Sequence, residues 1–208
     1  MPNRAHCALK CLEALRPAGK TLTVTMNVDD LHERAGSKDV WHIHGEISRA
    51  SCAKCGHRWD APEVMSPEDL CPSCGEAATR PDIVWVGEAP RYLEEIHARL
   101  RRAHLFVQIG SSGKVYPANN FVNVAQEAGV RTLTLNLEYP ENADGFDEIR
   151  EGKASEIVPE WVEGMLRQQC RLHALFMIGT VCRKLCRRIS DYMAKSIAHA
   201  RRLFRMPK

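Results

Sequence analysis

Two pairs of cysteines place the tightest constraint on how this 208-residue chain can fold. Cys52-x-x-Cys55 and Cys71-x-x-Cys74 are separated by 15 residues, and a glycine follows each pair directly. Two thiols at this spacing can reach one ion from a tight turn, and the glycine permits the positive φ that turns backbone N–H groups toward the sulfurs. Four such thiolates fit a tetrahedral Zn²⁺ with no open position, so the pairs predict a structural zinc site. His57 is an alternative ligand in place of one thiolate.

The cysteines also bear on the cellular compartment. The chain contains nine of them, and residues 1–20 contain no cleavable apolar run of the kind found in a secretory signal. Metal ligation in a reducing compartment is therefore favoured over a disulfide framework. We expect an intracellular protein, in the cytoplasm first, with the mitochondrion and the nucleus as alternatives. No segment of the sequence reaches the roughly 20 apolar residues that a membrane-spanning helix needs.

Charge is unevenly distributed along the chain. Residues 166–208 contain eleven Lys or Arg and one acidic residue, for a net charge of +10, whereas residues 1–165 carry −7. The apolar residues of the basic segment that recur at helical spacing are Val181, Leu185, Ile189 and Tyr192. We expect a basic helical or disordered tail, with an anionic membrane or nucleic acid as candidate partners. A solvated extension without a partner is the alternative.

Strand-like and helix-like segments alternate through the rest of the sequence. Apolar spacing predicts helices that begin near Asn3, after Pro90, around Phe121 and after Ser155. Strands are expected at residues 21–25, 83–86, 105–109 and 131–137. This alternation favours a parallel α/β sheet that is interrupted by a small cysteine-rich domain. The expected domains are residues 1–46 with 83–165, the zinc-binding insertion at 47–82, and the tail at 166–208.

Polar side chains gather in residues 23–46, which combine a short strand, a turn and a His-x-His-Gly sequence. Asn27 and Asp29 follow the strand two residues apart, so both can face one cleft beyond its carboxyl end, where ligands of α/β sheets bind. His44 precedes Gly45, whose lack of a side chain would let a ligand approach closely. A histidine at such a strand end can serve as a general base. A core or surface histidine without a chemical role is the alternative at His44.

Taken in order, these stretches resemble the sirtuin family of NAD-dependent protein deacylases. The segments that carry the resemblance over residues 2–165 are TMNVDDLHERAG, WHIHGE, the two CxxCG pairs, RPDIVWVGE, IGSSGKVYPA and LNLE. The segment GSSGKVYPANNF is similar to the branch that includes the bacterial enzyme and the animal desuccinylase. The resemblance implies a Rossmann-like parallel α/β sheet with an inserted zinc ribbon. It also implies NAD as co-substrate, one structural Zn²⁺ held by the four cysteines, and acylated-lysine proteins or peptides as partners.

The resemblance further implies a role for each matching residue. His44 would be the catalytic base. The acyl-lysine oxygen would displace nicotinamide from NAD, and His44 would deprotonate a ribose hydroxyl that attacks the acyl carbon, giving O-acyl-ADP-ribose. The residues implied in NAD binding are Asn27 and Asp29 at the nicotinamide, Gly110, Ser111 and Ser112 along the dinucleotide, Asn136 and Glu138 at the adenosine ribose, and Ala154 near the adenine. The substrate peptide would add as a strand between Val86, Gly87 and Glu88 on one side and Val115 and Tyr116 on the other.

The sequence departs from the family pattern in two places. The family begins with a strand and a Gly-rich loop that cradles the pyrophosphate, and these 208 residues contain no such loop. We therefore expect a partial sheet, without the first βα unit and with a gap or an unpaired edge, and impaired binding of NAD. Met26 stands where the family usually has Gln. A thioether cannot donate a hydrogen bond, so weaker positioning of the nicotinamide ribose is expected.

The leading hypothesis is a lysine deacylase of the deacetylase or desuccinylase type, and the sequence does not choose between the two acyl groups. The main alternative is a catalytically inactive sirtuin-like zinc protein that acts as a binding or regulatory module. Two further hypotheses are ADP-ribosyl transfer to protein, which uses the same ribose chemistry, and a zinc-ribbon nucleic-acid binder that uses the basic tail.

Overall fold

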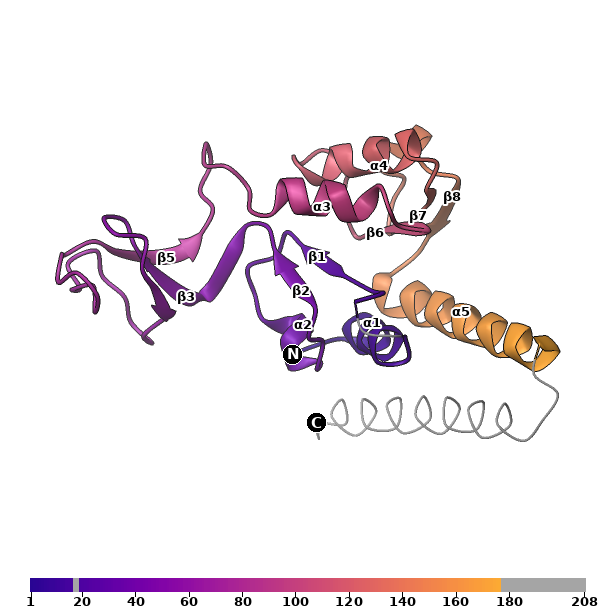
Figure 1. Cartoon of the computed structure of the whole chain (residues 1–208), viewed down its shortest axis with the longest axis horizontal. Coiled ribbons are helices and arrows are strands. Elements are labelled where there is room, and N and C mark those ends of the chain that lie inside the picture. The colour runs from indigo at the N-terminus through magenta and orange to yellow at the C-terminus, as the bar shows by residue number, and fades with distance from the viewer. Residues whose placement is uncertain (17–18, 177–208) are drawn as a thin grey trace. The chain divides into compact units, whose positions relative to one another are not determined.

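The structure is a computed structural model that describes residues 1–16 and 19–176, with side chains through residue 168. The chain divides into two compact units, whose elements Figure 1 labels. Unit 1 comprises Met1–Leu22, Leu31–Asp39 and the residues from Leu100 onward, and unit 2 comprises Thr23–Asp30 and Val40–Arg99. The apolar stripe expected in the basic tail, from Val181 to Tyr192, lies outside the described residues. The domain boundaries expected from the sequence stay a prediction.

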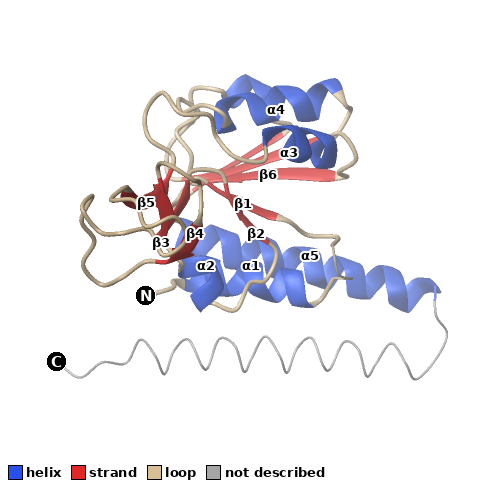
Figure 2. Ribbon diagram, turned by 60° about the vertical axis from the view of Figure 1, so that its left-hand side comes forward, coloured by secondary structure: helices blue, strands red, loops and turns tan. Residues whose placement is uncertain are grey.

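Unit 1 is built on a parallel sheet of three strands in the order β6 (Leu105–Ile109), β7 (Arg131–Asn136) and β8 (Glu148–Glu151). Figure 2 shows helix α4 (Ala118–Glu127) on one face of this sheet and helices α1 (Arg4–Ala14) and α5 (Ala154–Phe176) on the other. The short elements α2 (Leu31–Arg34) and η1 (Ala143–Gly145) complete the unit. Helices on both faces of a parallel sheet confirm the α/β architecture expected from the alternation of strands and helices.

The core of unit 1 lies between β7 and the helices α1 and α5. Every residue of β7 except Arg131 is buried, as expected for a central strand that is covered on both faces. Its Leu133 and Leu135 pack in one apolar cluster with residues of both helices, namely Ala5, Ala8, Leu12, Val158, Trp161, Val162 and Leu166. Helix α5 therefore continues through residue 166, where the basic tail was expected to begin. Over residues 1–16 and 19–176, no helix is long and apolar enough to cross a membrane.

Helix α1 begins where the sequence predicts. The side-chain oxygen of Asn3 accepts hydrogen bonds from the backbone N–H groups of Ala5 at 2.9 Å and His6 at 3.3 Å, which satisfies two of the donors that a helix start leaves unpaired. The helix ends at Ala14 with Leu15 as its C-cap, two residues before Pro17. Its buried residues are Ala5, Ala8, Cys11 and Leu12.

Unit 2 contains two small sheets. Strands β1 (Thr23–Thr25) and β2 (Val40–His42) pair in parallel. Strand β3 (Gly45–Cys52) pairs antiparallel with β4 (Arg58–Asp60) on one side and β5 (Thr79–Ile83) on the other, and α3 (Leu93–Leu100) follows. The parallel strands of the chain are thus divided between two sheets. Strand β1 is shorter than the expected 21–25, and Thr25 is its only buried residue.

The prediction of a strand at residues 83–86 is wrong. Strand β5 ends at Ile83, and the chain then turns: the N–H of Glu88 donates to the carbonyl of Trp85 at 2.9 Å, and Gly87 has a φ of 92°. The side chain of Glu88 also accepts a hydrogen bond from the N–H of Trp85 at 2.9 Å. A glycine at positive φ and a carboxylate that binds the turn's own backbone outweigh the strand propensity of the β-branched residues before them.

We expect Leu135→Ala to lower the free energy of unfolding of unit 1 by about 2–5 kcal/mol, because it opens a cavity at a fully buried position of β7. The matched control is Leu137→Ala, two residues further along, whose side chain is 60% exposed. We expect that control to change the free energy by about 0.5 kcal/mol or less. Urea denaturation followed by circular dichroism measures both, and equal effects of the two substitutions would contradict the assignment of the core.

Candidate functional site

The four cysteines predicted to hold zinc converge in unit 2. The sulfur atoms of Cys52, Cys55, Cys71 and Cys74 all lie within 4.8 Å of one another. The Sγ atoms of Cys52 and Cys74 are 3.7 Å apart, as are those of Cys55 and Cys71. A tetrahedron of thiolates about 2.3 Å from a Zn²⁺ has edges of about 3.8 Å. The donor set and its geometry therefore fit one Zn²⁺ with four protein ligands.

The turns that carry these cysteines are built as the sequence suggests. The N–H groups of Lys54 and Cys55 point at the sulfur of Cys52, at 3.3 and 3.4 Å, and the N–H of Ser73 points at that of Cys71 at 3.4 Å. The glycines that follow, Gly56 and Gly75, have φ values of 71° and 74°. The hydrogen bond from the N–H of Cys55 lowers the pKa of the Cys52 thiol, and the one from Lys54 adds to this effect. Burial raises the pKa, but the hydrogen bonds outweigh it and the pKa falls to about 7. At Cys74 the N–H of Glu76 lowers the pKa, but burial and hydrogen bonds with the other three thiols outweigh it and raise the pKa to about 12.

His57, the alternative zinc ligand, is exposed and stacks on Trp59 with ring centroids 5.7 Å apart. Within the described part of the chain, the group that could hold a metal consists of the four cysteines without His57. The four sulfurs complete a tetrahedral set by themselves, so the structure favours the all-cysteine site. Such a site has no open position and serves to hold strands together.

We expect Cys71→Ser to abolish stoichiometric zinc binding and to unfold the β4-β3-β5 sheet, because a closed site loses one of four thiolates. Metal analysis should show one zinc per chain before the substitution and none after it, and hydrogen exchange should show loss of protection in β3. Cys7→Ser is the matched control, since Cys7 lies on α1 outside the cluster. A Cys71→Ser chain that keeps one tightly bound zinc would contradict the site.

His44, the predicted base, is half-buried and lies directly before β3. Its Nδ1 is 3.1 Å from the backbone carbonyl oxygen of Met26. A carbonyl oxygen can only accept, so Nδ1 carries the hydrogen in the neutral ring, and Nε2 keeps its lone pair. This is the tautomer in which Nε2 can take a proton from a substrate. His42 is held in the same way, with Nδ1 3.1 Å from the carbonyl of Asn27, but it is buried.

Asn27 and Asp29 follow β1 in the same unit as His44. The segment they occupy is fastened to the His44 segment by backbone hydrogen bonds, from Ile43 N–H to Thr25 at 3.0 Å and from Ile47 N–H to Val28 at 2.8 Å. Asn27 is exposed and Asp29 is half-buried. The structure therefore brings the strand end with Asn27 alongside the segment with His44. The roles of Asn27 and Asp29 at a nicotinamide stay a prediction.

Gly45 packs closely against the backbone of Asp82 and Ile83. Its φ is 78°, and a Cβ atom there would collide with the carbonyl oxygen of Asp82 and lie 2.9 Å from the Cα of Ile83. Gly45 and Ile83 are partners in the pairing of β3 with β5. The expectation that Gly45 makes room for a ligand is therefore wrong, because the backbone of β5 takes that room.

We expect Gly45→Ala to destabilise unit 2 far more than a positive φ alone would. The control is Gly129→Ala, at a φ of 68° with no atom within 4 Å of an added Cβ, which should cost only the roughly 1–2 kcal/mol of a left-handed alanine. Gly45→Ala adds a clash with backbone, which cannot move aside as a flexible side chain can. Chemical denaturation compares the two, and a cost at Gly45 no larger than at Gly129 would contradict the close approach.

The residues predicted to bind the dinucleotide lie in unit 1, at the carboxyl ends of β6 and β7 and at the start of α5. Gly110 is exposed with open space around it, Ser112 and Glu138 are exposed, and Ala154 is half-buried. The side chains of Asn136 and Ser111 instead form hydrogen bonds within the protein. Asn136 is buried and its Nδ2 donates to the carbonyl of Ser111 at 2.8 Å, while the buried Oγ of Ser111 accepts from Gly113 N–H at 3.4 Å. Asn136 thus holds the loop after β6 in place.

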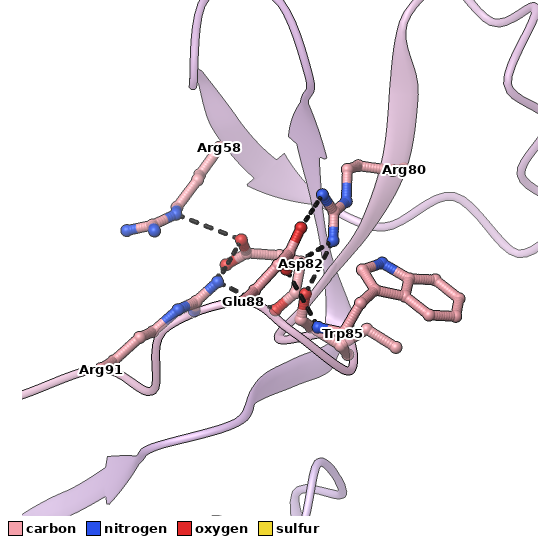
Figure 3. Close-up of polar contacts among 7 residues, drawn as sticks. Arg58, Arg80, Asp82, Trp85, Glu88 and Arg91 are labelled. Atoms are coloured by element: carbon pink, nitrogen blue, oxygen red, sulfur yellow. Dashed lines mark hydrogen bonds and ion pairs between the residues drawn. The ribbon is translucent and has the colours of Figure 1, made fainter.

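The residues predicted to bind a peptide strand are exposed for the most part. Val86, Val115 and Tyr116 expose large apolar side chains, the first in unit 2 and the other two in unit 1. Glu88 differs, because its carboxylate forms a double ion pair with Arg80, with oxygen–nitrogen distances of 2.6 and 3.0 Å, and also accepts from Trp85 N–H (Figure 3). These contacts lower the pKa of Glu88, the Arg80 hydrogen bond first. Glu88 shapes the turn that presents Val86.

A cluster of charges around Asp82 was missed in the sequence. The side chain of Asp82 is only 5% exposed and is paired with Arg91 and Arg58. Burial raises the pKa of this carboxyl, but hydrogen bonds and charges from Arg91 and then Arg58 lower it below its ordinary value, so the group is ionised. The three residues are 9 and 24 positions apart, and no local pattern connects residues at such distances. The only signal for this cluster in the sequence was the acidic residue inside the segment RPDI.

The sequence model of the Sir2 family matches residues 1–117. The NAD-dependent protein deacylase SIR2rp3 of Leishmania major is 48% identical over 174 residues, which cover 82% of this chain and 71% of that protein. The NAD-dependent protein deacylases of Caulobacter vibrioides and Escherichia coli K12 are 45% and 44% identical over 168 residues, covering 79% and 80% of this chain and 71% and 60% of those proteins.

Solved structures of Sir2 homologues also match this chain. A Sir2 homologue in complex with NAD superposes with a TM-score of 0.73 at 31% identity, covering 81% of this chain and 66% of that one. Sir2Af2 bound to a myristoylated histone peptide gives a TM-score of 0.69 at 32% identity, covering 82% of this chain and 74% of that one. The chain thus spans roughly two thirds of the length of the relatives it matches.

Proposed function

This chain belongs to the Sir2 family, and from that membership we propose that it is an NAD-dependent protein deacylase acting on acylated lysine side chains. The relatives support this, since those named above carry the same activity in their names at 44–48% identity over about four fifths of this chain. The observation that carries the proposal is the setting of His44. An imidazole with Nδ1 bound to the carbonyl of Met26 presents Nε2 as a base.

The chemistry proposed for His44 is removal of one proton. NAD supplies an activated ribose when its nicotinamide leaves, and a ribose hydroxyl must lose a proton to attack the acyl carbon. Nε2 of His44 accepts that proton while Nδ1 keeps its own, so the ring becomes a cation that the Met26 carbonyl continues to stabilise. No protein nucleophile is required. The residues proposed to hold NAD are Asn27, Asp29, Gly110, Ser112, Glu138 and Ala154.

The open backbone at Gly110 and the exposed side chains of Asn27, Ser112 and Glu138 suit contact with a bound ligand. The buried Asn136 and Ser111 are proposed to act indirectly, by shaping the loop that Gly110 begins. Val86, Val115 and Tyr116 are proposed to contact the peptide. The zinc cluster is too closed for chemistry and is proposed to order the sheet that begins beside His44.

The test is release of nicotinamide from NAD by the zinc-loaded chain, measured with and without acetyl-lysine and succinyl-lysine peptides, together with detection of O-acyl-ADP-ribose by mass spectrometry. We expect release that depends on an acyl-lysine peptide. His44→Gln should lower kcat by about 100-fold or more, the usual loss when a general base is removed. His57→Gln is the control, because His57 is exposed and its ring stacks on Trp59.

Three outcomes would contradict the proposal or the role that it gives to His44. A folded chain that binds one zinc and releases no nicotinamide would favour a sirtuin-like binding module instead. Transfer of labelled ADP-ribose to protein, without acyl-lysine dependence, would favour ADP-ribosyl transfer. Full activity of His44→Gln would remove His44 from the role of base.

A further inference from the structure

We propose that Asp82 is a positioning residue for His44, acting through the ion pairs that its buried carboxylate forms with Arg91 and with the exposed Arg58. The catalytic part of this inference rests on the proposed function, whereas its structural part concerns only the ring of His44. All the groups involved lie in unit 2. Asp82 does not contact His44 itself; it acts through the backbone that holds the histidine.

Two backbone donors hold the carbonyls around His44. The N–H of Val84 donates to the carbonyl of His44 at 2.8 Å, and the N–H of Arg91 donates to the carbonyl of Ile43 at 2.9 Å. Val84 and Arg91 stand at the two ends of the exposed turn that contains Trp85 and Glu88. Both ends of the turn therefore hold the His44 segment, in addition to the hydrogen bonds from Ile43 N–H to Thr25 and from Ile47 N–H to Val28.

The ion pair between Asp82 and Arg91 joins those two ends (Figure 3). Nη2 of Arg91 lies 2.6 Å from Oδ1 of Asp82, and Nη1 lies 3.0 Å from Oδ2, so the guanidinium grips the carboxylate with two parallel hydrogen bonds. Nη2 also donates to the backbone carbonyl of Asp82 at 3.2 Å. The side chains are 5% and 18% exposed. A pair this well shielded from water is screened much less than a surface pair.

Arg58 connects the same carboxylate to β4, the strand that follows the first zinc-binding turn. Its Nε lies 3.2 Å from Oδ1 of Asp82, and Arg58 begins β4, three residues after the zinc ligand Cys55. The carboxylate therefore receives hydrogen bonds from β4 and from the segment that leads into α3, while its own backbone belongs to β5. Three segments that are far apart in sequence meet at one buried charge, beside the strand pairing that begins at Gly45.

This arrangement bears on the histidine ring. The hydrogen bond from Nδ1 to the Met26 carbonyl selects the tautomer with a bare Nε2, and it requires the His44 backbone to stay where it is. If the Asp82–Arg91 pair is broken, the segment with Val84 is no longer fastened to Arg91, and the Nδ1 hydrogen bond loosens. The proton can then occupy Nε2, which leaves no base facing a substrate.

The experiment compares Asp82→Asn, which removes the charge at nearly constant shape, with Asp60→Asn. Asp60 is a matched control: it pairs with Arg49 at 2.5 Å across β3 and β4, but its side chain is 91% exposed. Nitrogen NMR of chains labelled with ¹⁵N-histidine, recorded at a pH above the range where histidine titrates, reports the tautomer of each ring. His44→Gln identifies the His44 signals by their loss. We expect Nδ1-protonated His44 in the parent chain and in Asp60→Asn, and a mixture of tautomers in Asp82→Asn.

Nicotinamide release is measured with the same chains. In Asp82→Asn we expect kcat for nicotinamide release to fall about tenfold or more, with the KM for the acyl-lysine peptide unchanged, because the base is displaced while the peptide-binding residues stay. Asp60→Asn should match the parent. If the parent chain releases no nicotinamide, the proposed function fails, and the NMR comparison alone decides the positioning role.

A folding defect would not obscure the result. The double variant Asp82→Asn with Arg91→Gln removes both charges, so no buried charge is left without a partner, and zinc content and circular dichroism verify its fold. We expect it to show the mixed tautomers of the single variant. A folded, zinc-bound single or double variant whose His44 remains wholly Nδ1-protonated would overturn the inference.

Discussion

The close packing of Gly45 against the backbone of Asp82 and Ile83 is the contact on which the organisation of unit 2 depends. It fixes the first part of the pairing between β3 and β5, in which Gly45 lies opposite Ile83 and Glu46 opposite Asp82, before the register shifts between Glu46 and Ala50. That register places the N–H of Val84 on the carbonyl of His44. A side chain at position 45 would separate the strands directly beside His44, the proposed base. The glycine next to the histidine is therefore explained by strand pairing and not by access for a ligand.

The same strand connects the closed metal site with the histidine that is proposed as the base. Strand β3 begins at Gly45, beside His44, and ends at Cys52, which is one of the four sulfur ligands. A sheet of three short strands has little apolar core of its own, and zinc supplies the stability that burial does not. Strand β3 runs from one position to the other and pairs with β5 on both sides of the register shift between Glu46 and Ala50, so order imposed at Cys52 reaches the segment that carries His44. The metal can thus support catalysis without taking part in it.

Local signals in the sequence predicted much of this structure, and contacts between distant residues account for what they missed. The CxxCG turns, the Asn3 cap and strand 105–109 are each defined by residues within one short stretch, and all three were placed correctly. The failure at 83–86 arose because the Glu88 side chain binds the Trp85 backbone and its charge is held by Arg80. Such a turn depends on partners that periodicity does not reveal.

Residues that resemblance places at a ligand can serve the protein in another way. Asn136 was expected at a ribose, yet its amide is buried and holds the Ser111 carbonyl. Glu88 was expected at a peptide, yet its carboxylate is already paired. Asp82 was not expected to matter, yet it joins three segments around the His44 backbone. In each case a buried or paired polar group fixes a backbone whose neighbours are proposed to meet the ligand: Gly110, Val86 and the half-buried ring of His44. Precise chemistry at a few exposed groups therefore depends on polar side chains that never reach the substrate, because they hold the backbone that presents those groups.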